Sequence, residues 1–176
     1  MHRLFVAIHP PAAIRDQLRG LMHGIAGARW QSDDQLHLTL RFIGEVDRHL
    51  AEDIASALGQ ISIPAFEIAL KSVGSFETDG KRSTLWVGID APQALKSLHS
   101  KIESAFRPLG LEPDHRRFLP HVTIARLNRN SGPIGDFLVQ NAGLASTPFP
   151  VSHFHLIESF LSLDGARYES IARYPL

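Results

Sequence analysis

The stretch Leu36-His37-Leu38-Thr39-Leu40-Arg41-Phe42-Ile43-Gly44 decides how this chain folds, and Pro120-His121-Val122-Thr123-Ile124-Ala125-Arg126 repeats its central pattern. Both stretches alternate apolar and polar residues with a period of two, which predicts strands with one buried and one open face. In each strand a histidine and a threonine two positions apart project from the open face. The two His-x-Thr pairs are therefore the first candidates for a functional site.

The two His-x-Thr strands belong to a longer internal repeat. Residues 4–14 (LFVAIHPPAAI) match residues 85–95 (LWVGIDAPQAL) at an offset of 81, and the histidines at 37 and 121 follow at an offset of 84. Each half thus reads as a strand, a helix and a His-x-Thr strand. We expect an α+β fold in which two antiparallel sheets flank a central cleft, with helices outside. The His-x-Thr faces would then meet across the cleft.

Hydrophobic periodicity and turn residues predict the other elements. Helices are expected at residues 11–26, 47–58 and 92–106, with a short one near 137–139. Asp47 is the expected cap of the second helix. Strands are expected at 4–8, 29–30, 66–76, 85–89, 149–162 and 168–173, with turns at 78–81 and around Asp164-Gly165. Because no flexible linker divides the chain, residues 1–176 are expected to form a single domain of two intertwined lobes.

The composition is that of an ordinary globular protein, with 44% hydrophobic and 20% charged residues. Lys and Arg (18) balance Asp and Glu (18), so an anionic ligand must be held by a local cluster. The absence of cysteine excludes disulfides, thiolate catalysis and cysteine-ligated zinc. No stretch is long enough to span a bilayer, and the N-terminus lacks a signal-peptide pattern. We therefore expect a cytoplasmic monomer with no membrane association and no obligate protein partner.

Two facing imidazoles provide a general base and a general acid near neutral pH, because free histidine titrates near pH ~6.5. The two threonine hydroxyls between them would donate hydrogen bonds to phosphate oxygens. This geometry suits an in-line displacement at phosphorus, in which one histidine deprotonates water and the other protonates the departing oxygen. Such a reaction needs no covalent intermediate, metal or cofactor.

The chain resembles the two-histidine (2H) phosphoesterase superfamily, and more narrowly the RNA 2′,3′-cyclic phosphodiesterases, also called 2′-5′ RNA ligase-like proteins. The resemblance is carried by residues 3–8 (RLFVAI), 37–44 (HLTLRFIG), 85–88 (LWVG) and 118–126 (FLPHVTIAR). It implies a bilobal α+β fold and metal-independent opening of terminal 2′,3′-cyclic phosphates to 2′-phosphates, with weak reverse 2′-5′ ligation. RNA ends or nucleoside 2′,3′-cyclic phosphates are the implied partners.

The resemblance assigns His37 and His121 as catalytic residues, with His37 as the acid and His121 as the base. Thr39 and Thr123 are assigned to substrate binding, as is Arg126. Strict alternation places Arg126 on the face opposite Thr123, so either a bulge or the end of the strand turns it toward the site, or its role is structural. The resemblance favours the turned arginine.

Three further residues are weighed as substrate contacts. Arg41 stands where the family commonly has lysine, and alternation places it on the open face with His37. Phe42 falls on the core face by the same alternation, so Phe118 is the better candidate for stacking a base, ahead of Trp86. Arg82, Arg116 and Arg117 are candidate cations for an RNA backbone.

Two alternatives stay open at this point. A non-catalytic module would bind nucleotides or phosphorylated RNA ends without turnover. A metallohydrolase would use His37 and His121 with His153 and His155, whose spacing on a strand is compatible with metal ligation. No carboxylate is obviously paired with these histidines, so we expect no metal site.

Overall fold

The computed structural model describes residues 1–163 and 165–176, apart from the side chain of Arg82. A nine-stranded antiparallel sheet dominates it, in the order β7-β4-β5-β6-β3-β1-β8-β9, and β2 pairs with β6. The strands are β1 (His2–Ile8), β2 (Arg29–Trp30), β3 (Leu38–Val46), β4 (Phe66–Thr78), β5 (Lys81–Asp90), β6 (His121–Arg126), β7 (Phe149–Val151), β8 (His153–Ser162) and β9 (Gly165–Pro175).

The sheet consists of two four-stranded halves with matching order, β3-β1-β8-β9 and β6-β5-β4-β7. Among the described residues the halves are joined at one ladder position, where Leu38 pairs with Val122. These are the central residues of the two His-x-Thr motifs, so the pseudo-two-fold relation passes between the motifs. The expected α+β class and the duplication are confirmed, and the two antiparallel halves form one continuous hydrogen-bonded path.

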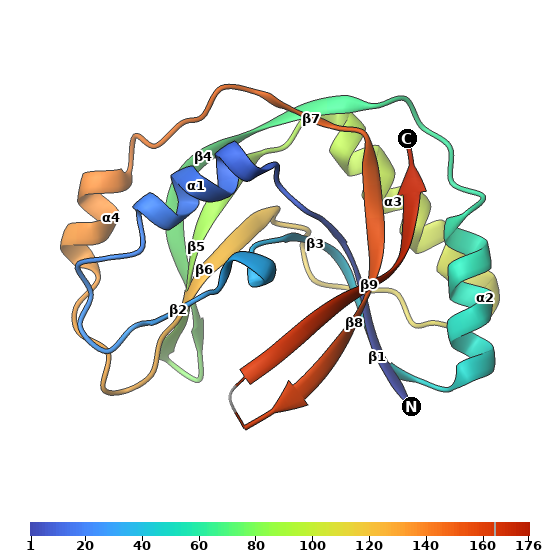
Figure 1. Cartoon of the computed structure of the whole chain (residues 1–176), viewed down its shortest axis with the longest axis horizontal. Helices are drawn as coiled ribbons and strands as arrows, with labels where there is room; N and C mark the ends of the chain where they lie inside the picture. The colour runs from blue at the N-terminus through green and yellow to red at the C-terminus, as the bar shows by residue number, and fades with distance from the viewer. Residues whose placement is uncertain (164) are drawn as a thin grey trace.

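Helices cover one face of this sheet (Figure 1). They are α1 (Ala12–Gly20), α2 (Arg48–Leu58), α3 (Gln93–Phe106) and α4 (Gly135–Asn141), with 3₁₀ turns η1 (Asp33–Gln35) and η2 (Arg107–Leu109). α2 contacts β1, and α4 contacts β4. α3 follows β5 in the chain yet also contacts β3, which interleaves the two halves. The main core lies between these helices and the sheet, where Leu4, Val6 and Ile8 of β1 are at most 2% exposed.

No helix of the described residues covers the other face of the sheet, and we call it the open face. Phe5, Ala7 and Ile157 form a small separate cluster there, against which Tyr168 packs. The strict alternation of β1 between the main core and this cluster is the pattern of a strand with two different environments. The side chains of both His-x-Thr motifs project from the open face.

Most local predictions are confirmed, but two are wrong. The strand expected over 149–162 is divided into β7, which pairs with β4, and β8, which pairs with β1. Asp47 caps α2 by accepting a hydrogen bond from Leu50 N at 2.9 Å, and residues 78–81 form the β4–β5 turn. The first helix ends at Gly20, and it cannot extend to residue 26 because Gly24 has a φ of +83°, which is incompatible with a continuing helix. Asp164, in the predicted final turn, lies outside the described residues.

Candidate functional site

A β-bulge in β6 turns Arg126 to the open face. Thr123 pairs with Trp86, but Ala125 pairs with the residue immediately before Trp86, so Ile124 is an extra residue in the ladder. Ile124 and Ala125 are both fully buried, whereas Arg126 is exposed. The bulge therefore breaks the alternation, and Arg126 shares the open face with Thr123.

A bulge at the equivalent position of β3 has the opposite consequence for Arg41. Thr39 pairs with Ala7 on the open face, whereas Arg41 pairs with Val6 of the main core, so Leu40 is the extra residue. Arg41 is thereby turned to the helix-covered face. The prediction that Arg41 shares a face with His37 is not met in this structure, because the alternation on which it rested is broken at Leu40.

The contacts of Arg41 agree with this placement. Its Nε lies 2.7 Å from Glu103 of α3, its Nη1 lies 3.8 Å from Asp114, and its side chain is only 11% exposed. The same bulge turns the next residue outward. Phe42 is 39% exposed instead of belonging to the core, and the guanidinium of Arg3 lies 5.0 Å from the centre of its ring. Arg41 is thus a structural cation that anchors α3 to β3.

His121 opens β6 and has a fixed orientation. Its Nδ1–H donates to the carbonyl of Leu119 at 2.6 Å, which leaves Nε2 as the free nitrogen of the neutral ring. The ring packs edge-on against Phe76 at 4.9 Å and beside Trp86 at 6.0 Å. Burial lowers the pKa of His121, the bond to Leu119 raises it and the nearby Arg126 lowers it.

The indole of Trp86 is held in place by a glycine on the neighbouring strand. Gly74 pairs with Trp86, and a Cβ built on Gly74 would lie 2.3 Å from the indole ring. The ring therefore occupies space that any other residue at position 74 would fill. Glycine at this position lets the indole lie flat against β4, where it supports His121.

His37 immediately precedes β3 and is the more deeply enclosed of the two histidines. Its ring packs between Phe5 at 4.9 Å and Tyr168 at 5.2 Å. Its pKa is lowered to about 4, chiefly by burial and next by the neighbouring His9, while the backbone of Gln35 opposes the shift. The contact between Nδ1 and Gln35 falls short of full hydrogen-bond geometry, because Nδ1 is buried without a partner among the described residues.

The two histidines, their threonines and Arg126 come together where the halves of the sheet meet. Arg126 and His121 both lower the pKa of His37, and Arg126 also lowers that of His121, so one guanidinium acts on both rings. The Leu38–Val122 pair sets an antiparallel register that places His37 beside Thr123 and Thr39 beside His121. The arrangement offers two imidazoles, two hydroxyls and one cation to a single anion.

Phe118, the predicted stacking residue, contacts a different histidine from those at the site. The aromatic rings beside His121 are those of Phe76 and Trp86. The ring of Phe118 stacks on His99 of α3, with centroids 4.1 Å apart and planes inclined by 9°, and it packs against the main core. Phe5, Phe76 and Tyr168, which contact the catalytic candidates, were missed by sequence reasoning. The repeat offered a signal for Phe5, since it aligns with Trp86, but nothing local marks Tyr168 or Phe76, whose strands lie far along the chain.

The other residues predicted to bind an RNA backbone or a metal ion are Arg82, Arg116, Arg117, His153 and His155. Arg116 forms a two-point contact with Asp114, at 2.9 and 2.7 Å, and the Arg82 side chain lies outside the described residues. His153 and His155 lie on the open face of β8. Within the described part of the chain, no three histidine or carboxylate side chains are placed to hold a metal ion.

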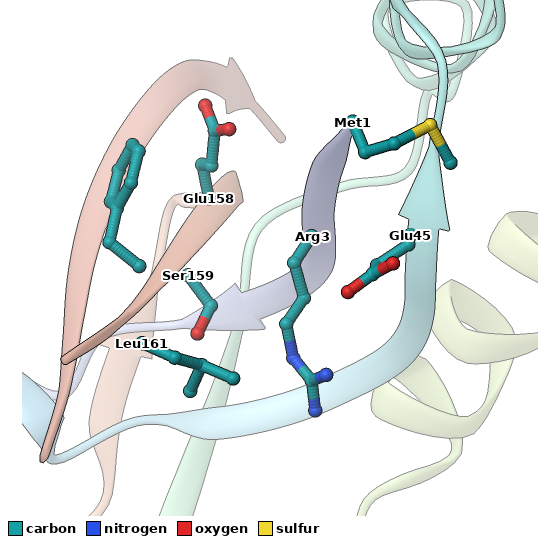
Figure 2. A pocket seen from close by; sticks show the side chains of 7 residues that line it. Met1, Arg3, Glu45, Glu158, Ser159 and Leu161 are labelled. Carbon is teal, nitrogen blue, oxygen red and sulfur yellow. The ribbon is translucent and has the colours of Figure 1, made fainter. Parts of the chain in front are cut away.

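A cavity of about 260 Å³ lies away from these residues. It is lined by Met1 and by residues of β1, β3 and β8, and Figure 2 shows Arg3 and Glu45 extending along it from neighbouring strands. None of the predicted site residues lines it, and Arg3 lies about 20 Å from the end of β1 nearest His37, at ~3.3 Å per residue. This cavity therefore does not mark the chemical site.

No helix among the described residues is both long and apolar enough to cross a membrane. The chain was compared with protein families and with known proteins. The family model described as 2′-5′ RNA ligase superfamily matches residues 10–159, most of the chain.

Curated relatives and solved structures agree with this match. An RNA 2′,3′-cyclic phosphodiesterase of Archaeoglobus fulgidus is 26% identical, over 96% of this chain and 97% of the relative. One from Aeropyrum pernix is 30% identical, over 79% and 81%. The structure of E. coli LigT complexed with 3′-AMP is 27% identical, with a TM-score of 0.79, and the match covers 99% of this chain and 98% of that one. The chain therefore belongs to the 2′-5′ RNA ligase superfamily.

Proposed function

We propose that this protein hydrolyses terminal 2′,3′-cyclic phosphates of RNA to 2′-phosphates by two-histidine acid–base catalysis. The observation that carries the proposal is the convergence of His37, His121 and Arg126 at the junction of the two halves. The relatives named RNA 2′,3′-cyclic phosphodiesterase, which match nearly the whole chain, support the same reaction. Reverse 2′-5′ ligation would follow from the same groups acting in the opposite direction.

The reaction would proceed by in-line displacement. A water oxygen attacks phosphorus while one imidazole takes its proton. The bond from phosphorus to O3′ breaks, and the second imidazole gives its proton to O3′. The hydroxyls of Thr39 and Thr123 donate to the non-bridging oxygens, and Arg126 offsets the charge that develops on them. Hydrogen-bond donors and the guanidinium stabilise the transition state, so a metal ion is not required.

We assign the base to His121 and the acid to His37. The bond from His121 Nδ1–H to Leu119 keeps Nε2 unprotonated in the neutral ring, as a base requires. His37 must carry a proton to act as an acid, yet its pKa is lowered to about 4, chiefly by burial. A phosphate anion beside the ring raises this pKa, so the assignment implies that His37 takes up a proton when substrate binds.

The non-catalytic binding module is the second candidate, and the intact pair of histidines and threonines weighs against it. The metallohydrolase would need a ligand group that the described residues do not provide. We further propose that the protein acts on RNA ends as a cytoplasmic monomer of one domain, without a protein partner.

Incubation of a nucleoside 2′,3′-cyclic phosphate with the purified protein in EDTA, followed by ³¹P NMR, tests the proposal. We expect complete conversion to the nucleoside 2′-phosphate at a rate that EDTA does not change. Binding without product after long incubation would support the binding module instead. Inhibition by EDTA, together with stoichiometric metal in the purified protein, would support the metallohydrolase.

A further inference from the structure

A row of basic side chains continues from His37 across the open face. His9 follows the last paired residues of β1, which are Ile8 with Leu38 of β3 and Ala7 with His155 of β8. It lies close enough to His37 to lower the pKa of that imidazole. His155 of β8 pairs in turn with Arg173 of β9. We call His9, His153, His155 and Arg173 the histidine strip. Its members lie on one face because buried Phe154 separates the two histidines of β8.

Side-chain contacts show that the strip is one cluster. The ring centroids of His9 and His155 are 4.9 Å apart, and those of His153 and His155 are 5.0 Å apart. Arg173 Nη2 lies 3.2 Å from Nδ1 of His153. Because a guanidinium only donates, this Nδ1 must be the unprotonated acceptor, and the neutral ring then carries its proton on Nε2. The strip thus presents N–H donors from both Arg173 and His153.

Among the described residues, the strip has no acidic partner. Arg173 is in no ion pair with a described carboxylate. The charged or titratable groups that act on its three imidazoles are Arg15 of α1, Arg173 and the histidines themselves. No three histidine or carboxylate groups of the described chain are placed to hold a metal. An anion is therefore the ligand that this chemistry favours.

The other half of the sheet does not repeat the strip. In the internal repeat His9 aligns with Asp90, whose carboxylate lies 3.8 Å from the ammonium of Lys71. The duplication alone would thus not have placed histidines here. The strip extends the site in one direction only, across β1 and β8 toward β9 in the strand order β3-β1-β8-β9.

We propose that the histidine strip binds a phosphodiester group of the RNA strand, next to the nucleotide that carries the terminal cyclic phosphate. The inference rests on the proposed function and specifies its substrate as an oligonucleotide. β8 is separated from β3 by β1, so at ~4.8 Å per strand His155 lies roughly 10 Å from the row of His37. A nucleotide whose cyclic phosphate contacts His37 would place its 5′ phosphate over the strip.

The protonation of the strip should change when the anion binds. The pKa of His155 is lowered to about 4, chiefly by burial and in addition by His9, His153 and Arg173. Burial also lowers the pKa of His9 and of His153. At pH 7 the fixed charge of the empty strip is therefore that of Arg173. A phosphate oxygen raises these pKa values, so oligonucleotide affinity should increase as the pH falls from 7 toward 5.

Three substrates with the same terminal cyclic phosphate test the proposal. They are a nucleoside 2′,3′-cyclic phosphate, the dinucleotide that ends in it, and the dinucleotide with an uncharged methylphosphonate linkage. We expect kcat/KM to be about tenfold higher for the charged dinucleotide than for the other two, the effect of one hydrogen bond to a charged group. Arg173→Gln and His155→Gln should bring this ratio toward one, and Arg173→Lys should retain part of it.

Arg167→Gln is the matched control, because Arg167 lies on the same strand but faces Glu169 and Phe160. It should leave the substrate ratio unchanged, and thermal melting will show whether each variant is folded. Equal kcat/KM values for all three substrates would overturn the inference while leaving the proposed function intact. An equal gain from the uncharged dinucleotide would overturn it in favour of base stacking.

Turnover of none of the substrates would contradict the proposed function itself. Calorimetric binding of the nucleoside 2′-phosphate and of the dinucleotide 2′-phosphate then measures the strip independently of catalysis. Tighter binding of the dinucleotide that disappears in Arg173→Gln would support the strip, and equal binding of the two ligands would contradict it.

Discussion

The strands that carry His37 and His121 share a bulge but turn different side chains toward the open face. The extra residues, Leu40 and Ile124, are 84 positions apart, as the two histidines are. Two residues after each bulge, the open face receives Phe42 in one half and Arg126 in the other. Both halves therefore retain the same bulged backbone, but only the half that contains β6 places an arginine on the open face at this position. One guanidinium suits a site that holds one phosphate between two acid–base groups.

The two histidines also differ in their surroundings. His121 donates from Nδ1 to Leu119 at 2.6 Å. Nδ1 of His37 has no hydrogen-bond partner among the described residues, and burial lowers its pKa to about 4. A symmetric fold thus supplies two chemically different imidazoles. The two proton transfers of a displacement at phosphorus can therefore be divided between them.

Removal of either imidazole should have the largest effect on activity. We expect His37→Ala and His121→Ala each to lower kcat by roughly 10²–10⁴-fold, the contribution of one general acid or base. Steady-state assays on a nucleoside 2′,3′-cyclic phosphate measure the loss, and circular dichroism checks that the fold is retained. Near-normal turnover by either variant would rule out a shared two-histidine mechanism.

The lowered pKa of His37 should make the free energy of unfolding depend on pH. The unfolded state protonates His37 near pH 6.5, but the folded state does so only near pH 4, so stability is lost as the pH falls between these values. For a shift of about 2.5 units this loss is on the order of 3 kcal/mol. Urea unfolding should therefore show a smaller loss between pH 7 and pH 4 for His37→Gln than for the wild type.

The exposed His49 of α2 provides the control for this experiment. His49→Gln should follow the wild type between pH 7 and pH 4. An equal loss of stability in wild type and His37→Gln would mean that the buried imidazole does not resist protonation.

The two positions after the bulges should respond differently to truncation. Arg126→Ala is expected to lower kcat/KM by roughly 10–100-fold, since a hydrogen bond to a charged group contributes about 1.5–3 kcal/mol. Phe42→Ala, at the equivalent position, should stay near the wild-type value, and Arg126→Lys should lose less than Arg126→Ala. Equal losses of kcat/KM in Phe42→Ala and Arg126→Ala would contradict the inference that only position 126 supplies a cation to the site.

The glycine beneath Trp86 should give the smallest effect. Gly74→Ala places a Cβ in the indole ring, and relief of this overlap costs about 1–3 kcal/mol. We expect lower stability, altered tryptophan fluorescence and a reduced kcat, because Trp86 supports His121. Gly143→Ala is the control, since its Cβ would meet nothing within 4 Å. Unchanged fluorescence in Gly74→Ala would show that the indole is not held by this contact.

The sequence predicted the centre of this site well because the relevant information is local. Period-two alternation and the repeat identified His37, Thr39, His121 and Thr123 as open-face residues at the junction of two halves. The alternation placed Arg126 on the face opposite Thr123, and a bulge was one of the alternatives that the sequence left open.

Alternation failed beyond Leu40 because a bulge leaves no signature in residue type. Leu40 and Ile124 are ordinary apolar residues, so Arg41 and Phe42 were assigned to the wrong faces. Tyr168 could not be predicted because its approach to His37 depends on the position of β9 at the far end of the chain. The register of the final hairpin, rather than any nearby motif, brings it there.

The most direct test of the central claim is a comparison of the two histidine variants on a cyclic phosphate analogue with an activated 3′ leaving group. A good leaving group needs no general acid, but the attacking water still needs a base. We predict that this substrate restores turnover to His37→Ala and leaves His121→Ala inactive. Rescue of His121→Ala alone would reverse the two roles, and equal rescue of both variants would contradict the division of acid and base between the two halves.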